Sequence, residues 1–172
     1  MTRSNNSLPL EGIKILDFTW SVAGPTMTRY LAGLGAQIFK VEWPKGPDPM
    51  RTAMYRSDTD EKNLNNGAFF SNLNVGKKSL TINVKDPDGL QVIKDVIAQV
   101  DAVTESFSAS VMERWGLGFD TMREINPQIV YVSVAGFGHS GPHADKNTWG
   151  PTAQAMSGMT AVSYTHLRAH ET

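Results

Sequence analysis

The sequence contains no cysteine among its 172 residues. Disulfide bonds, thiolate zinc sites, iron–sulfur clusters and a cysteine nucleophile are therefore excluded. Neither sign of charge dominates, because the formal net charge is -1. This balance gives no electrostatic argument for a nucleic-acid partner or an anionic membrane.

Long hydrophobic runs are also missing. No segment approaches the roughly 18 apolar residues that a membrane-spanning helix needs. The opening stretch, MTRSNNSLPLEG, lacks the apolar core of a signal peptide. We therefore expect a cytoplasmic protein with no membrane partner. At 40% hydrophobic and 19% charged residues, the chain is long enough for one well-buried domain or part of a larger one.

Short apolar runs rich in β-branched residues alternate with segments of helical periodicity. This pattern predicts an α/β fold, a Rossmann-like parallel sheet with flanking helices. The predicted strands are 13–18, 36–42, 78–84, 101–107 and 128–137. A right-handed crossover would place the second strand parallel to the first and beside it. Residues 43–66 have no sustained period and form a long excursion of the kind that is often functional.

Two helices carry clear signals. The first follows the first strand and stops at Gly35, with a predicted apolar stripe of Met27, Tyr30, Leu31 and Leu34. The second begins with Asp86 as N-cap and Pro87 in its first turn, and its predicted buried face is Leu90, Ile93, Val96 and Ile97. A short helical pair is expected in 109–126.

The glycine fingerprint of dinucleotide binding is incomplete. GFGHSG, with Gly136, Gly138 and Gly141, matches the glycine spacing and follows a strand. However, Pro142 and His143 come next instead of a helix that could offer its N-terminus to a pyrophosphate. We therefore interpret this segment as a glycine-rich turn, and a nicotinamide-dependent oxidoreductase is disfavoured.

No local pattern marks a catalytic or metal-binding residue. His139 and His143 are separated by Gly and Pro and have no third ligand nearby, so no metal is predicted. Acidic residues at strand ends are predicted to be caps or ion-pair partners, namely Asp17, Glu42, Asp101 and Glu105. A nucleophile elbow and a P-loop are both missing.

Four blocks carry a resemblance: LEGIKILDFTWSVAGPTMTRYLAGLGAQIFKVEWP, NLNVGKKSLTINVKDPDGL, DAVTESFSASVMERWGLGFDTMREINPQIVYVSVAGFGHSGP and WGPTAQAMSGMTA. In order and spacing they resemble the class III coenzyme A transferases, the family of formyl-CoA and carnitine CoA transferases, to which the α-methylacyl-CoA racemases are related. The resemblance implies that residues 1–162 are the N-terminal part of the large, CoA-binding domain.

The resemblance also implies a chemistry. In this family an aspartate carboxylate attacks an acyl-CoA thioester, and CoA passes through an enzyme-bound thioester to a carboxylic acid acceptor. Acyl-CoA is then a substrate, no cofactor is permanently bound, and the full-length protein is an interlocked homodimer. Positions expected to contact CoA are Ser21, Val22, Ile82, Asn83, Val84, Lys85, Ser106, Phe107, Ser108 and Arg114. The family block ENF-x-PG stands here as ESFSAS, which keeps the aromatic ring but loses the asparagine and the Pro-Gly turn.

Two departures shape the functional expectation. Racemases use a GHD histidine as a proton-transfer base, and the matching triplet here is Thr148, Trp149 and Gly150, whose indole cannot accept that proton. The family's nucleophilic aspartate follows Gly158, but this chain has no aspartate there. We therefore expect a transferase by descent that is truncated before its nucleophile and inactive alone, the alternatives being a non-catalytic CoA-binding fragment or a racemase-like isomerase.

The last segment, SYTHLRAHET at 163–172, follows no block of the family. It resembles a translated sequencing adapter, and we interpret it as a non-native tail. His166 and His170 have helical spacing within it, but we assign them no role.

Overall fold

The computed structural model describes residues 7–43, 45–53 and 63–162. These residues form two compact units. The sheet unit comprises the chain up to Phe107 together with Val111–Val134, and the second unit comprises Ser108–Ser110 together with the chain from Ala135. His166 and His170 lie outside the described residues.

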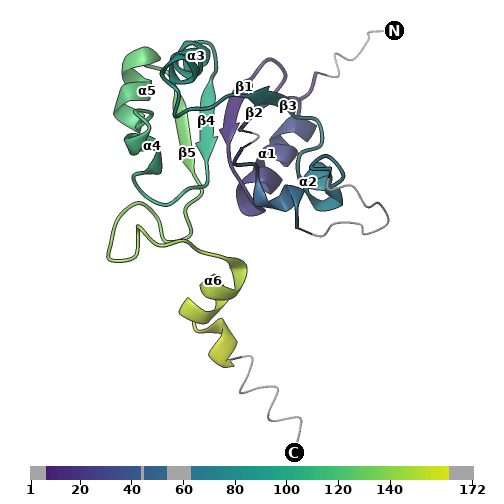
Figure 1. The fold of residues 1–172 in the computed structure, drawn as a ribbon, viewed down its shortest axis with the longest axis vertical. Coiled ribbons are helices and arrows are strands. Elements are labelled where there is room, and N and C mark those ends of the chain that lie inside the picture. The colour runs from purple at the N-terminus through teal and green to yellow at the C-terminus, as the bar shows by residue number, and fades with distance from the viewer. Residues whose placement is uncertain (1–6, 44, 54–62, 163–172) are drawn as a thin grey trace, which may run out of the picture. The chain divides into compact units, whose positions relative to one another are not determined.

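The sheet unit is built on a parallel sheet of five strands in the order β3-β2-β1-β4-β5 (Figure 1). The strands are β1 Lys14–Phe18, β2 Gln37–Glu42, β3 Lys78–Thr81, β4 Ala102–Glu105 and β5 Val130–Ser133. This topology confirms the predicted α/β fold and the parallel pairing of the first two strands. The predicted strands that extended to Val84 and Phe137 were too long. The pairing of β3 with β2 ends at Thr81↔Glu42, and the pairing of β5 with β4 ends at Glu105↔Ser133.

Helices cover both faces of the sheet. Figure 1 shows α1 and α2 on one side and α3, α4 and α5 on the other. Their bounds are α1 Ala23–Gly33, α2 Ala68–Leu73, α3 Pro87–Ile97, α4 Val111–Arg114 and α5 Phe119–Ile125, with a 3-10 turn, η1, at Pro49–Arg51. In the second unit, α6 is Gly150–Met156. Among the described residues, no helix is long and apolar enough to cross a membrane.

Helix α3 matches its prediction. The Asp86 side chain accepts hydrogen bonds from the backbone N–H groups of Asp88 and Gly89, and Pro87 occupies the first turn. Ile93 and Ile97 are fully buried, and Leu90 and Val96 pack beside them. The N-cap and the apolar stripe therefore fix both the start of α3 and the face that it buries.

The predicted stripe on α1 was wrong at Tyr30 and Leu34, whereas Leu31 packs against the cluster of Ile15, Ala36 and Ile38. Tyr30 is 68% exposed and Leu34 is 44% exposed. The helix instead buries Gly24, Pro25 and Thr28. A Cβ on Gly24 would come within 2.4 Å of the Thr19 Cβ, so glycine permits a close approach to the sheet that a larger residue would prevent.

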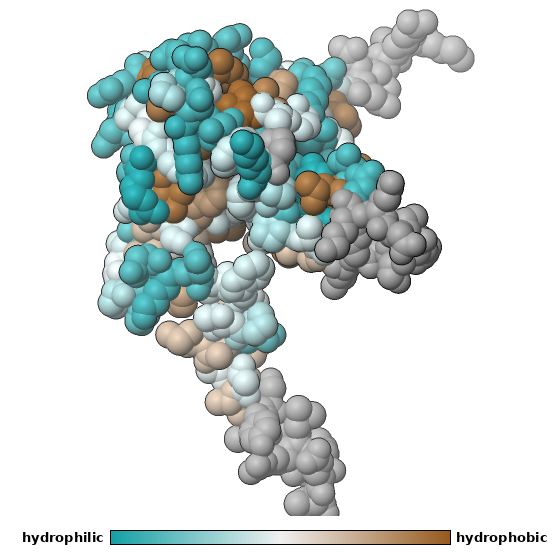
Figure 2. Space-filling view, viewed as in Figure 1, coloured by the Kyte–Doolittle hydropathy of each residue, from teal (hydrophilic) through white to brown (hydrophobic). Residues whose placement is uncertain are grey.

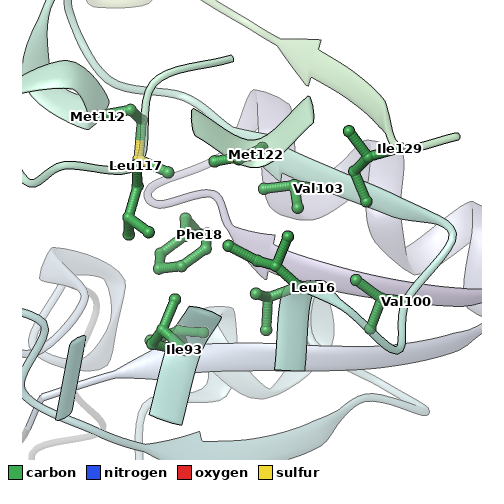
Figure 3. Close-up of a cluster of buried hydrophobic side chains, with 11 residues drawn as sticks. Leu16, Phe18, Ile93, Val100, Val103, Met112, Leu117, Met122 and Ile129 are labelled. Atoms are coloured by element: carbon green, nitrogen blue, oxygen red, sulfur yellow. The ribbon is translucent and has the colours of Figure 1, made fainter. Parts of the chain in front are cut away.

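The main hydrophobic cluster lies between the sheet and α3, α4 and α5. Figure 3 shows Leu16 and Phe18 of β1 and Val103 of β4 facing Ile93 and Met122. On the opposite face, Ile15, Ala36 and Ile38 form a smaller cluster beneath α1. Hydrophilic residues cover much of the visible surface of the sheet unit (Figure 2).

Candidate functional site

The candidate site lies at the carboxyl ends of β1 and β4. These strands are neighbours in the sheet, but the chain leaves them toward opposite faces, which makes this the topological switch point of the fold. In open α/β sheets, ligands bind in the crevice outside such a point. The segments that meet here are 19–22 after β1 and 106–107 after β4.

Ser106 joins the two segments. Its hydroxyl accepts a hydrogen bond from the Trp20 N–H at 2.8 Å and donates one to the Trp20 carbonyl at 3.3 Å. The rings of Trp20 and Phe107 meet edge to face with centroids 5.7 Å apart, and Phe107 contacts Trp115 in the same manner at 5.1 Å. Since a serine has one hydroxyl proton, Ser106 cannot donate to a ligand without breaking its hydrogen bond to the Trp20 carbonyl.

The turn after β1 is held from beneath by buried charged side chains. Lys40, which is 3% exposed, donates to the Thr19 carbonyl at 2.7 Å and to Asp48 Oδ2 at 3.2 Å. Asp48 Oδ1 accepts from the Ser21 N–H at 3.3 Å. Ser21 has a φ of 64°, in the left-handed region that non-glycine residues rarely adopt.

A second buried carboxylate, Asp17, ties α1 to the sheet. Its oxygens accept from the Thr19 N–H at 2.9 Å and from the hydroxyls of Thr28 at 2.7 Å and Thr104 at 3.2 Å. Lys77 completes the arrangement with an ion pair of 3.1 Å. Burial lowers the pKa of Lys77, and the charge of Asp17 only partly opposes that effect.

The third ion pair joins the end of β2 to the long excursion. Arg51 Nε and Nη2 bind the two carboxylate oxygens of Glu42 at 2.8 and 2.7 Å, and the guanidinium lies 3.7 Å from the centre of the Phe70 ring. Burial alone would raise the pKa of Glu42, but the hydrogen bonds and charge of Arg51 outweigh burial and lower it. The prediction that Glu42 is an ion-pair partner is therefore confirmed.

On the other face of the sheet, Glu105 serves as a cap, as predicted for an acid at a strand end. Its Oε2 accepts from the Phe107 N–H at 2.6 Å, and its Oε1 accepts from the Tyr131 hydroxyl at 3.2 Å. Burial, together with the neighbouring Glu105 charge, raises the pKa of Tyr131. Asp101 caps in the same manner, accepting from the Lys14 N–H at 2.8 Å.

The other positions predicted to contact CoA are more dispersed. Ile82 and Val84 are partly buried and pack against the main hydrophobic cluster. Asn83 Oδ1 accepts from the backbone N–H of Lys85, whose side chain is exposed after β3. Arg114 is exposed on α4. Thus Ser21, Val22, Ser106 and Phe107 come together at the switch point, whereas the Ile82–Lys85 segment follows the edge strand β3.

Ser108 belongs to the second unit. Its hydroxyl donates to Asn147 Oδ1 at 2.6 Å, and the backbone N–H of Ala109 donates to the Ala144 carbonyl. In the same unit, GFGHSG forms turns and no helix opens at Gly141, as predicted. Within the described part of the chain, no group of three potential ligands could hold a metal ion.

Sequence reasoning missed Lys40 and Asp48. A lone lysine inside an apolar strand ordinarily indicates a solvent-facing position, and Asp48 lies in the excursion that shows no period. The alternation of side chains along β2 contained the signal. Ile38, Lys40 and Glu42 share one face of β2, and α1 packs on that face, so Lys40 is buried beside the apolar Ile38.

The fold is a doubly wound α/β fold whose topological switch point lies between β1 and β4. The chain belongs to CoA-transferase family III, whose family model matches residues 10–169. It is 36% identical over 159 residues to the human succinyl-CoA:glutarate CoA-transferase, in an alignment that covers 92% of this chain and 35% of the relative. It is 38% identical over 154 residues to a formyl-CoA:oxalate CoA-transferase of Streptomyces avermitilis, in an alignment that covers 90% of this chain and 36% of the relative.

Solved structures give the same assignment. A CAIB/BAIF family protein from Brucella suis superposes with a TM-score of 0.77 at 32% identity, covering 88% of this chain and 40% of that one. The chain therefore spans well under half the length of the curated and structural relatives that it matches.

Proposed function

We propose that this chain supplies the CoA-binding part of an acyl-CoA:carboxylate CoA-transferase that acts in the cytoplasm as a homodimer. The observation that carries the proposal is the junction of the β1 and β4 turns through Ser106 and Trp20 at the switch point. Family membership supports the same function, since the relatives named above are CoA-transferases.

The chemistry that we propose is nucleophilic catalysis by an aspartate. Its carboxylate attacks the thioester carbonyl and expels CoA thiolate, leaving a mixed anhydride. The thiolate then attacks the aspartyl carbonyl, releases the donor carboxylate and leaves an aspartyl-CoA thioester. The acceptor carboxylate attacks that thioester and expels CoA thiolate, which attacks the acceptor's carbonyl in the new anhydride, frees the aspartate and gives the acceptor's CoA thioester. By this route CoA moves between two carboxylic acids without net hydrolysis.

The aspartates beneath the turn are not suited to that attack. Asp17 and Asp48 are 0% and 1% exposed, and both of them accept several hydrogen bonds and pair with buried lysines. We therefore propose that the nucleophile lies outside residues 1–162 of the whole protein. On this proposal, the 172-residue chain binds CoA but does not transfer it.

For CoA itself, the first turn of α1 offers the backbone N–H groups of Ala23 and Gly24, since Pro25 has none. This turn carries no acidic residue and no side-chain cap, and the Asp48 carboxylate that accepts the preceding Ser21 N–H is buried; we propose that the turn receives a phosphate or thioester oxygen. Lys85 and Arg114 are exposed and supply positive charge for the CoA phosphates.

A CoA titration of the 172-residue chain by calorimetry tests the proposal. We expect Lys85→Ala and Arg114→Ala each to weaken binding by about tenfold, the loss of one charged phosphate contact worth about 1.4 kcal/mol. Arg123→Ala is the matched control, because Arg123 is an exposed arginine in the last turn of α5 and should leave the affinity unchanged. A folded wild-type chain that binds no CoA would refute the proposed function.

The transfer step is tested separately with radiolabelled glutarate and succinyl-CoA, the substrates in the name of the human relative. We expect no label in glutaryl-CoA with the 172-residue chain. Transfer by this chain would show that one of its own carboxylates is the nucleophile. Racemisation is disfavoured because Trp149 has no proton-accepting side chain, and the absence of deuterium uptake from D2O into a 2-methylacyl-CoA would agree with that view.

A further inference from the structure

Asp48 has contacts that exceed those of an ordinary helix cap. Its Oδ1 accepts from the Met50 N–H at 3.0 Å, which caps η1, and also from the Ser21 N–H at 3.3 Å. Its Oδ2 pairs with Lys40 at 3.2 Å. One buried carboxylate thus connects the long excursion, β2 and the turn that follows β1.

The turn needs such support. A left-handed φ at a residue with a side chain is unfavourable, and it persists only where the surroundings hold it. At Ser21 those surroundings include Asp48 on its own N–H, Lys40 on the Thr19 carbonyl and Ser106 on both polar groups of Trp20. Asp48 is the member of this set that touches Ser21 directly.

We propose that Asp48 is a positioning residue for CoA binding: by accepting the Ser21 N–H, it fixes the left-handed turn and so orients the N–H groups of the first turn of α1 at the carboxyl ends of β1 and β4. This proposal rests on the proposed function for its effect on CoA. Its structural half, the anchoring of Ser21, stands apart from CoA binding and can be measured alone.

The Glu42 side chain extends the arrangement by one more link. Its Oε1 accepts from the Asp48 N–H at 3.4 Å while it also pairs with Arg51. Asp48 is therefore held at its backbone as well as at its carboxylate. This double anchoring is what a residue needs if it is to impose a conformation on a neighbouring turn rather than follow it.

The test compares three variants of the 172-residue chain. Asp48→Ala removes the acceptor. Asp48→Asn is the conservative variant, because it keeps an oxygen for Ser21 and Met50 but loses the charge facing Lys40. Asp101→Ala is the matched control, since Asp101 also accepts a backbone N–H, that of Lys14, but at the opposite ends of the strands. Circular dichroism establishes that each variant is folded.

Two measurements are made on each folded variant: the hydrogen-exchange rate of the Ser21 amide by NMR, and the CoA affinity by calorimetry. With Asp48→Ala we expect exchange at Ser21 to become at least about tenfold faster and CoA binding about tenfold weaker, the factor that corresponds to one lost hydrogen bond. With Asp48→Asn we expect both quantities to stay within about threefold of wild type, and with Asp101→Ala we expect neither to change.

The outcomes separate the proposal from the proposed function. Folded Asp48→Ala protein with a protected Ser21 amide and wild-type affinity overturns the proposal. So does an Asp48→Asn protein that keeps the Ser21 protection yet loses CoA, because charge rather than positioning would then be responsible. If the wild type binds no CoA, the proposed function fails, and the exchange rates still decide whether Asp48 anchors the turn. If Asp48→Ala does not fold, Asp48→Asn decides: loss of CoA binding with Ser21 still protected overturns the proposal, and retention of both agrees with it.

Discussion

Replacing Asp17 by alanine should destabilise the sheet unit strongly. Asp17 is fully buried at the end of β1, and its carboxylate accepts from Thr19, Thr28, Thr104 and Lys77. The alanine variant leaves Lys77 without its ion-pair partner and leaves the hydroxyls of Thr19, Thr28 and Thr104 without this acceptor.

The magnitude follows from the surroundings of Lys77. Removing one partner of a buried ion pair costs about 3–5 kcal/mol, because the remaining charge stays desolvated. The Lys77 side chain is 1% exposed, but it also donates to the Pro25 carbonyl at 3.1 Å and to Asn74 Oδ1 at 2.9 Å. These two acceptors stabilise the orphaned ammonium, so we expect a loss of about 3 kcal/mol, the lower end of that range.

Urea unfolding at pH 7, followed by far-UV circular dichroism, measures the free energy of unfolding. Asp120→Ala serves as control, since Asp120 is exposed in the first turn of α5 and its removal should cost less than about 1 kcal/mol. The double variant Asp17→Ala/Lys77→Met should lose less than the sum of the two single variants, with a coupling of about 1–3 kcal/mol.

The pH dependence gives a second check. The pKa of Lys77 is already lowered by burial, and removal of Asp17 takes away an effect that raises it. The unfolded variant then holds a proton that the folded variant has released, so stability rises with pH toward the ordinary Lys77 pKa of 10.5. The destabilisation by Asp17→Ala should therefore shrink as the pH increases. A variant within about 1 kcal/mol of wild type at pH 7, or a constant difference across pH, would refute the reasoning.

Two further predictions concern other parts of the chain. Arg51 holds the pKa of Glu42 below 4.5, so on acidification the unfolded state takes up a proton before the folded state does, and stability falls as the pH drops below 4.5. Glu42→Gln should reduce this fall, measured as the change of the melting temperature with pH in the acidic range. An unchanged dependence on pH would contradict the role of the Glu42–Arg51 pair. In the second unit, a Cβ on Gly136 would lie 2.4 Å from the Thr148 Cβ; Gly136→Ala should therefore cost about 1–3 kcal/mol, seen as faster hydrogen exchange in 135–162, and Thr148→Gly in the same chain should restore protection if the clash is the cause.

Local patterns were sufficient where the side chains that decide a structure are neighbours in sequence. The start of α3 needed only Asp86 and Pro87, and its buried face only the spacing of Ile93 and Ile97. Strand order beyond the first pair and the ends of β3 and β5 depend on which neighbours the ladders have, and no local pattern contains that information.

The candidate site shows the same division. The resemblance brought Ser21 and Ser106 into one site, and the structure joins their segments through Trp20. It could not show that the Ser106 hydroxyl is engaged with the backbone, because that depends on how β1 and β4 pair. The stripe on α1 was wrong at Tyr30 and Leu34 for a related reason: Thr28 faces the sheet to bind Asp17, so hydrogen bonding outweighed apolar periodicity in orienting the helix.

Along the α1 face of the sheet, the amino-terminal halves of β1 and β2 are apolar, with Ile15 and Ile38, and the carboxyl-terminal halves are charged, with Asp17 and Lys40. A slip of β2 past β1 by one residue would exchange the two faces of β2, moving Lys40 to the side of the sheet that carries Leu16 and Phe18. Such a mispaired sheet would bury ions without counterions, whereas an all-apolar face would tolerate it. The ion pairs beneath the turn thus select one alignment of the strands during folding, whatever they add to the final stability.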